Sequence, residues 1–178
     1  TYPINETMLH EGPPHHSNDA YAYSKRLLEI QCKAYREQYG DDFVCVIPTN
    51  IYGIHDNYSL QDGHVIPALV HRCYLAKQNQ EDFIVAGTGQ PLRQFIYSLD
   101  LARLIIWILE KYTGEDSIIL APSETEEVSI RTVAELIAKQ FDYQSRLKFD
   151  QSQSDGQFRK TASNAALVSQ YGDLRLTS

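Results

Sequence analysis

The chain has 178 residues, of which 43% are hydrophobic and 22% are charged, and its formal net charge is −7. This composition is typical of a folded domain with a hydrophobic core and excludes intrinsic disorder. The longest apolar run, near residues 104–109, is too short to cross a bilayer, and the first residues lack signal-peptide features. We therefore expect a cytoplasmic protein without a membrane partner, and the lack of a basic patch argues against nucleic-acid binding.

The cysteines and the N-terminal histidines carry no metal pattern. Cys32, Cys45 and Cys73 are widely spaced and match neither a zinc motif nor a disulfide framework. Each lies in an apolar stretch, so we expect three buried, reduced thiols. Three histidines within residues 10–16 lie in a proline-rich loop without matching cysteines or carboxylates, and we expect no metal there.

Helical and strand patterns alternate along the chain. A helix is expected to begin at Asn18 or Asp19, to present one apolar face as far as Tyr39, and to end at Gly40. A buried strand over residues 42–47 follows, ended by Pro48-Thr49-Asn50 and a polar loop. We then expect a helix over 64–78, a strand over 83–85, an extended segment over 93–97, a helix from 98 to 112, a strand over 117–120, a helix over 130–141, a strand over 147–149 and a polar tail. This alternation predicts an α/β fold with parallel strands.

Tyr21 and Lys25 form a Tyr-x-x-x-Lys pair, one turn apart on the first predicted helix. An ammonium group at this spacing stabilises a phenolate, so the tyrosine could donate or accept a proton. The same spacing arises by chance in a tyrosine-rich chain, and the alternative is a plain surface pair. No G-x-G-x-x-G or Walker loop occurs, since Gly87-Thr88-Gly89 lacks a third glycine. A dinucleotide phosphate cradle is therefore expected to lie outside this chain.

Several short motifs occur together with the Tyr-x-x-x-Lys pair in a fixed order. They are Tyr2-Pro3-Ile4, Gly12-Pro13-Pro14-His15, Pro48-Thr49-Asn50, His55-Asp56-Asn57, Asp62-Gly63-His64-Val65-Ile66-Pro67 and Ser154-Asp155-Gly156-Gln157-Phe158. Over nearly the whole chain this order resembles the extended short-chain dehydrogenase/reductase superfamily and, within it, the GDP-L-fucose synthase family. The resemblance implies an NAD(P)-binding, Rossmann-like fold with a smaller substrate-binding lobe. The His64 segment is the more specific part, because the whole superfamily shares the Tyr-x-x-x-Lys pair.

The resemblance implies an NADP-dependent enzyme that epimerises C3 and C5 of a GDP-linked 4-keto-6-deoxyhexose and then reduces C4, giving GDP-L-fucose. Tyr21 would protonate the C4 oxygen, Lys25 would hold the nicotinamide ribose, and His64 would be the general acid of epimerisation. The implied NADP(H) contacts are Tyr21, Lys25, Pro48, Thr49, Asn50, Ile51 and His64. The implied substrate contacts are Asn50, Val65, Arg72, Ala86, Arg93, Asp155 and Lys160.

Each of these residues also has a purely structural interpretation. His64 could be a solvated residue at a helix start, and Arg72 and Arg93 could pair with surface carboxylates. Asp155 in Ser-Asp-Gly reads as an ordinary turn. Ala86 stands where the family often has tryptophan, which leaves the packing of base or sugar at that wall open.

The resemblance also divides the chain. Residues 1–50 would complete the nucleotide-binding domain and residues 51–178 would mainly form the substrate-binding lobe, with 93–112 returning to the first domain. The family's glycine-rich half and its catalytic serine and cysteine would precede residue 1. The fold is therefore expected to be incomplete and the isolated chain to be inactive.

The family resemblance implies a homodimer that packs through the helix carrying Tyr21 and Lys25. The outward positions Leu27, Ile30 and Ala34 are compatible with this arrangement. Two alternatives remain open at this point. One is another nucleotide-sugar epimerase or dehydratase of the superfamily, and the other is a non-catalytic module that binds a partner.

Overall fold

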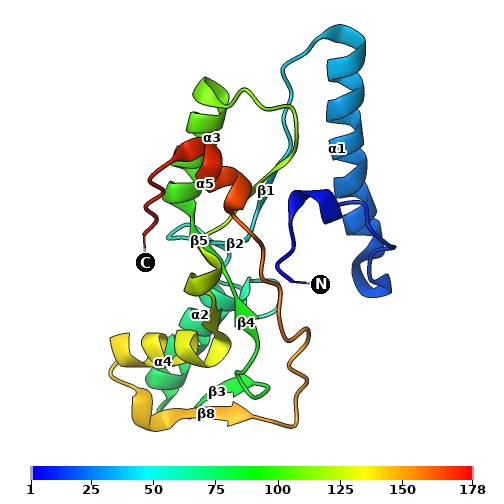
Figure 1. The fold of residues 1–178 in the computed structure, drawn as a ribbon. Helices are drawn as coiled ribbons and strands as arrows, with labels where there is room; N and C mark the ends of the chain where they lie inside the picture. The colour runs from blue at the N-terminus through cyan, green and yellow to red at the C-terminus, as the bar shows by residue number, and fades with distance from the viewer. Residues whose placement is uncertain (1, 178) are drawn as a thin grey trace.

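The computed structural model describes residues 2–177, and helices and short strands alternate along it (Figure 1). The helices are α1 (Asp19–Tyr39), α2 (Val65–Asn79), α3 (Ser98–Lys111), α4 (Ile130–Gln140) and α5 (Ala165–Tyr171). The strands are β1 (Val46–Pro48), β2 (Asn50–Tyr52), β3 (Phe83–Ala86), β4 (Leu92–Arg93), β5 (Phe95–Tyr97), β6 (Ile118–Leu120), β7 (Val128–Ser129) and β8 (Leu147–Asp150). Single 3-10 turns lie at Glu6–Met8, His16–Asn18, Glu124–Glu126 and Gln144–Arg146.

Parallel pairing dominates, as the alternation of helices and strands predicts. Strand β1 pairs with β6, β2 with β5 and β3 with β8, all in parallel, while β4 and β7 form a short antiparallel pair. The α/β prediction is therefore confirmed.

The strand expected over residues 42–47 is placed differently. Strand β1 begins at Val46 and ends at Pro48, and a second extended segment, β2, already begins at Asn50 where a loop was expected. The amide of Thr49 donates to the carbonyl of Leu120 on β6 at 3.2 Å. Alternate amides of a strand face opposite edges, so the amide that Pro48 lacks is not needed for pairing with β6.

Two larger hydrophobic clusters and one small cluster form the core of residues 2–177. One of the larger clusters forms where α2, β3, α4 and β8 meet, and its buried members are Leu69, Cys73, Ala76, Phe83, Val85, Val133, Ala134 and Ala138. The other larger cluster joins α3 to β5, β6 and α5, and its buried members are Ile96, Leu101, Leu104, Ile108, Ile118, Leu120 and Leu167. The predicted division at residue 50 stays a prediction. The structure adds β6 and α5 to the core that the returning segment 93–112 helps to form.

Helix α1 stands beside the rest of the chain in Figure 1, and none of its residues is buried. It begins at Asp19 and ends where Gly40 adopts the left-handed conformation with φ +73°, as predicted. Leu27, Ile30 and Ala34 are exposed, which agrees with their predicted outward positions. The predicted apolar face of α1 therefore meets no core within residues 2–177.

Two expectations need correction. Only Cys73 is buried, while Cys32 and Cys45 are partly exposed, because Cys32 lies on α1 and Cys45 precedes β1. Burial raises the pKa of the Cys45 and Cys73 thiols. The polar tail also contains helix α5, whose Leu167 is fully enclosed. None of the helices within residues 2–177 is long and apolar enough to span a bilayer.

Candidate active site

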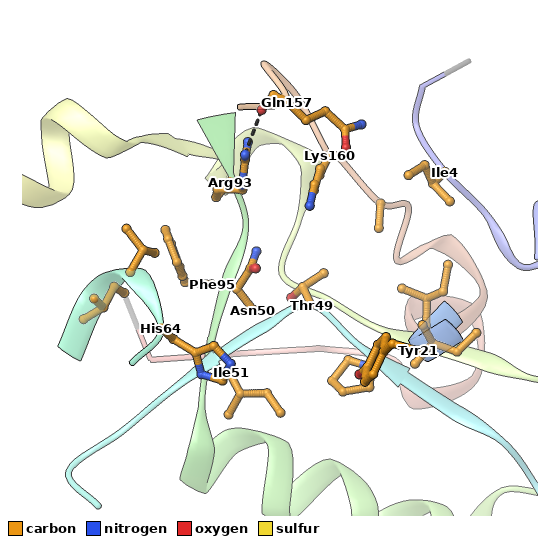
Figure 2. Close-up of a pocket in the computed structure, with 16 residues that line it drawn as sticks. Ile4, Tyr21, Thr49, Asn50, Ile51, His64, Arg93, Phe95, Gln157 and Lys160 are labelled. Carbon is orange, nitrogen blue, oxygen red and sulfur yellow. Dashed lines mark hydrogen bonds between the residues drawn. The ribbon is translucent and has the colours of Figure 1, made fainter. Parts of the chain in front are cut away.

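A cleft of about 710 Å³ gathers most of the predicted site residues (Figure 2). Those that line it are Tyr21, Pro48, Thr49, Asn50, Ile51, His64, Val65, Arg93 and Lys160. They come from the start of α1, the β1–β2 junction, the start of α2, strand β4 and the C-terminal segment. Crevices beyond the carboxyl ends of parallel strands are where α/β folds bind ligands.

Tyr21 occupies one end of the cleft, in the first turn of α1 (Figure 2). The ammonium of Lys25, one turn further along, lies 5.4 Å from the centre of the Tyr21 ring. Lys25 itself does not line the cleft. The helical spacing therefore produces the contact that the Tyr-x-x-x-Lys motif predicts.

His64 lies at the other end of the cleft, at the residue that precedes α2. Its carbonyl accepts the amide of Ala68 at 3.0 Å, which fixes the backbone, while 77% of its side chain is exposed. The His64 Nδ1 atom lies 3.6 Å from the Oδ1 atom of Asp56. Asp56 belongs to the His55-Asp56-Asn57 motif, and no local pattern predicts a role for its carboxylate.

The wall between Tyr21 and His64 is made by the β1–β2 junction. Asn50 donates its side-chain amide to the carbonyl of Gln94 at 2.8 Å, which fixes its orientation. The hydroxyl of Thr49 is enclosed and has no hydrogen-bond partner within residues 2–177. Gln94 is itself buried, and its side chain donates to Ala162 at 3.0 Å and accepts from Ala162 at 2.7 Å. Gln94 is a structural residue of the site that no local sequence pattern indicates.

Residues 157–162, which we call the strap, cross beside the cleft and carry Lys160 into it. Arg93 holds the strap, because its guanidinium donates to the carbonyl of Gln157 at 2.7 Å and to its neighbour Leu92 at 2.6 Å. Burial lowers the pKa of Arg93. Arg93 thus has a structural role in addition to the substrate contact predicted for it.

Three predicted substrate contacts, Arg72, Ala86 and Asp155, lie outside the cleft lining. Arg72 donates to the carbonyl of Ile84 at 3.4 Å. Asp155 accepts from the amide of Thr88 at 2.6 Å and from its hydroxyl at 2.7 Å, and the hydroxyl contact lowers the pKa of Asp155. Asp155 thereby fastens the loop after β3, a long-range role that the local turn interpretation did not include. The substrate contacts of all three remain predictions.

The chain fits one end of a nicotinamide dinucleotide. The cleft wall offers the backbone of residues 48–51 and the enclosed, unpartnered hydroxyl of Thr49. The Gly87-Thr88-Gly89 turn is not an open anion site, because the amide of Thr88 already donates to Asp155. The described residues therefore suit the nicotinamide end and show no matching cradle for the phosphates.

Comparisons with known proteins agree with this arrangement. The chain is 54% identical over 177 residues to a GDP-L-fucose synthase from Dictyostelium discoideum, covering 99% of this chain and 55% of the relative. It is 36% identical over 166 residues to the GDP-L-fucose synthase of Escherichia coli, covering 89% and 52%. The chain thus spans about half the length of these curated relatives.

Solved structures show the same fold. A GDP-L-fucose synthetase from Naegleria fowleri bound to NADP superposes with a TM-score of 0.96 at 46% identity, covering 100% of this chain and 57% of that one. A profile of the NAD dependent epimerase/dehydratase family matches residues 1–120. That match spans the Tyr21–Lys25 pair, the β1–β2 junction, His64 and Arg93. The chain therefore belongs to the NAD dependent epimerase/dehydratase family.

Proposed function

We propose that this chain supplies the sugar-binding and proton-transfer residues of an NADP-dependent enzyme that converts GDP-4-keto-6-deoxy-D-mannose to GDP-L-fucose. The observation that carries the proposal is the meeting of Tyr21 and His64 in one cleft, although 43 positions separate them in the sequence. The names of the similar proteins support the same substrate class.

Epimerisation needs a base on one face of the sugar and an acid on the other. Loss of a proton α to the C4 keto group leaves an enolate, and a proton delivered to the opposite face inverts the carbon. His64 is exposed into the cleft, and an imidazolium is a suitable donor near neutral pH. The resemblance places the base, a cysteine, before residue 1.

Reduction completes the reaction at C4. NADPH, when bound, supplies the hydride. Tyr21 then donates its phenolic proton to the C4 oxygen, and the nearby ammonium of Lys25 stabilises the resulting phenolate. Residues 48–51 line the space between Tyr21 and His64, where the reacting carbon would lie.

The substrate's diphosphate calls for positive charge at the opposite side of the cleft. Arg93 and Lys160 both line it there, above Asn50 and Thr49 in the view of Figure 2. Guanidinium and ammonium groups bind phosphate oxygens through charge-assisted hydrogen bonds. Part of the Arg93 guanidinium already donates to Gln157, so we assign Lys160 the more accessible contact with the diphosphate.

We also infer a cytoplasmic homodimer that packs through α1. The support is the exposed apolar surface of this helix, where Leu27 and Ile30 are each at least half exposed. An exposed apolar helix face is typical of an association surface. Size-exclusion chromatography with light scattering tests the dimer, and replacing both residues with lysine is expected to give a monomer.

The deciding experiment measures proton exchange at C3 and C5 of the substrate in deuterium oxide. The full-length protein is expected to incorporate deuterium at both carbons, and His64→Asn to lose this exchange while NADPH binding stays nearly intact. A 4-epimerase of the same superfamily would leave both carbons unlabelled. Absence of exchange in the unmodified protein would therefore refute the proposed substrate chemistry, and unchanged exchange in His64→Asn would refute the role of His64.

A further inference from the structure

The carboxylate of Asp56, which is not among the predicted site residues, faces the Nδ1 atom of His64. The Asp56 Oδ1 atom lies 3.6 Å from His64 Nδ1, and only 15% of the Asp56 side chain is exposed, against 77% for His64. Asp56 is therefore a mostly enclosed group, held against the base of the imidazole, whereas the rest of the ring reaches into the cleft.

The loop that carries Asp56 is fixed by its own hydrogen bonds. The Asp56 carboxylate accepts the amide of Asn57 at 2.7 Å, and the Asn57 side chain accepts the amide of Ser59 at 2.9 Å. The carbonyl of Ser59 accepts the amide of Gly63 at 3.0 Å. A side chain at position 63 would collide with the carbonyls of Asn57 and Ser59. The loop thus returns tightly on itself and delivers Asp56 to the residue that starts α2.

We propose that Asp56 is the positioning residue for His64. The proposal rests on the proposed function, because it assigns the proton that His64 delivers. The Asp56 carboxylate favours a proton on Nδ1, so the proton on Nε2 is the one that faces the cleft. The tautomer of a histidine is selected by the group that its other ring nitrogen meets, as a carboxylate does in catalytic triads.

At each epimerised carbon, one proton passes from His64 Nε2 to the carbon. The Nε2–H bond of the imidazolium breaks, and the electron pair of the enolate double bond forms the new C–H bond. The enolate oxygen returns to a neutral ketone, and His64 becomes a neutral imidazole that keeps its proton on Nδ1 beside Asp56. The negative enolate and the positive ring are both neutralised, and His64 takes up a proton from solvent water before it serves the second carbon.

The test compares Asp56→Asn with Asp62→Asn in the full-length protein. Both variants remove one carboxylate from the same loop, but the Asp62 side chain is exposed. Deuterium exchange at C3 and C5 is measured with NADP⁺ present, so that reduction does not follow. We expect exchange to fall about tenfold to a hundredfold in Asp56→Asn, less than the full worth of a general acid. Asp62→Asn is expected to exchange at the rate of the unmodified protein.

A second readout reports the imidazole directly. In protein labelled with ¹⁵N-histidine, the His64 signals, assigned by their loss in His64→Asn, are expected to show the Nδ1–H tautomer in the neutral ring. Asp56→Asn should shift this population toward Nε2–H, while NADPH binding stays unchanged. A purely structural role for Asp56 would not move the tautomer.

The outcomes separate the two proposals. If the unmodified protein does not exchange C3 and C5, the proposed function fails. If it exchanges and Asp56→Asn matches it in both rate and tautomer, the proposed function stands and the role of Asp56 is overturned. A loss of NADPH binding in Asp56→Asn would also count against a positioning role, because it would show that the loop supports the fold of the site.

Discussion

The strap depends on one enclosed carboxylate, and its removal is expected to loosen the cleft. Only 6% of the Glu127 side chain is exposed. It accepts from Arg159 Nη2 at 2.9 Å and from Arg159 Nε at 3.0 Å, and the hydroxyl of Thr161 donates to its other oxygen. Glu127→Gln keeps the shape of the side chain but removes its charge.

The size of the effect follows from the exposure of the partners. Hydrogen bonds to charged groups contribute about 1.5–3 kcal/mol each to stability, and breaking a fully buried pair costs about 3–5 kcal/mol. Because 43% of the Arg159 side chain is exposed, water compensates part of its lost partner. We expect Glu127→Gln to lower the free energy of unfolding by about 1–3 kcal/mol.

Urea denaturation measures this change as a lower midpoint at an unchanged slope. Glu124→Gln is the matched control, since it removes the same charge from an exposed side chain three residues away. The strap carries Lys160 into the cleft, so Glu127→Gln should also raise KM for the GDP-sugar more than it lowers kcat. Equal urea midpoints for Glu127→Gln and Glu124→Gln would refute the anchoring role of Glu127.

Three further predictions test the docking of α5 on the core, the contact of Asp155 with the loop after β3, and the role of Tyr21 as proton donor. Leu167→Ala should lower the free energy of unfolding by about 2–5 kcal/mol, because the Leu167 side chain is fully enclosed. Val168→Ala, on the exposed face of α5, should lower it by less than about 1 kcal/mol. Similar urea midpoints for the two variants would contradict the docking of α5. The lowered pKa of Asp155 contributes stability that is present above the unfolded carboxyl pKa of about 3.9 and is lost as the pH falls through the lower folded pKa. In Thr88→Val, stability should therefore fall less between about pH 5 and pH 2 than in the unmodified protein. An unchanged acid profile of the urea midpoint would count against the contact between Thr88 and Asp155. Tyr21→Phe should slow reduction about a hundredfold to ten-thousandfold in single-turnover NADPH oxidation, with full activity as the contrary result.

The parts of the fold that repeat at a regular period could be predicted. Helix α1 begins at Asp19 and ends before Gly40 as expected, because capping residues and an apolar period mark both of its ends. The resemblance also found nine of the residues that line the cleft. Helix α5 was missed because seven residues are too few to show a period, and its stability comes from packing against β6.

Contacts between distant residues left no local trace. Asp155 meets Thr88 across 67 positions, and Gln94 meets Ala162 across 68. Each of these side chains reads as an ordinary polar residue of a loop or strand end. Asp56 and His64 are closer in sequence, but they meet only because the loop between them returns on itself. Such pairings are set by tertiary structure, which a local pattern does not encode.

The strap also has a consequence for the order of folding during synthesis. Ile4 bridges Ala162 in parallel, with amide–carbonyl bonds of 2.8 Å to Thr161 and Ser163. Tyr21 leaves the ribosome before the strap, and the strap cannot reach its place beside the cleft until residue 163 has been made. Contacts of such long sequence separation slow folding, because the loop must close before they form. The nascent chain therefore exposes the apolar lining of its cleft until translation has nearly passed the end of this sequence, an interval in which chaperones are expected to bind it.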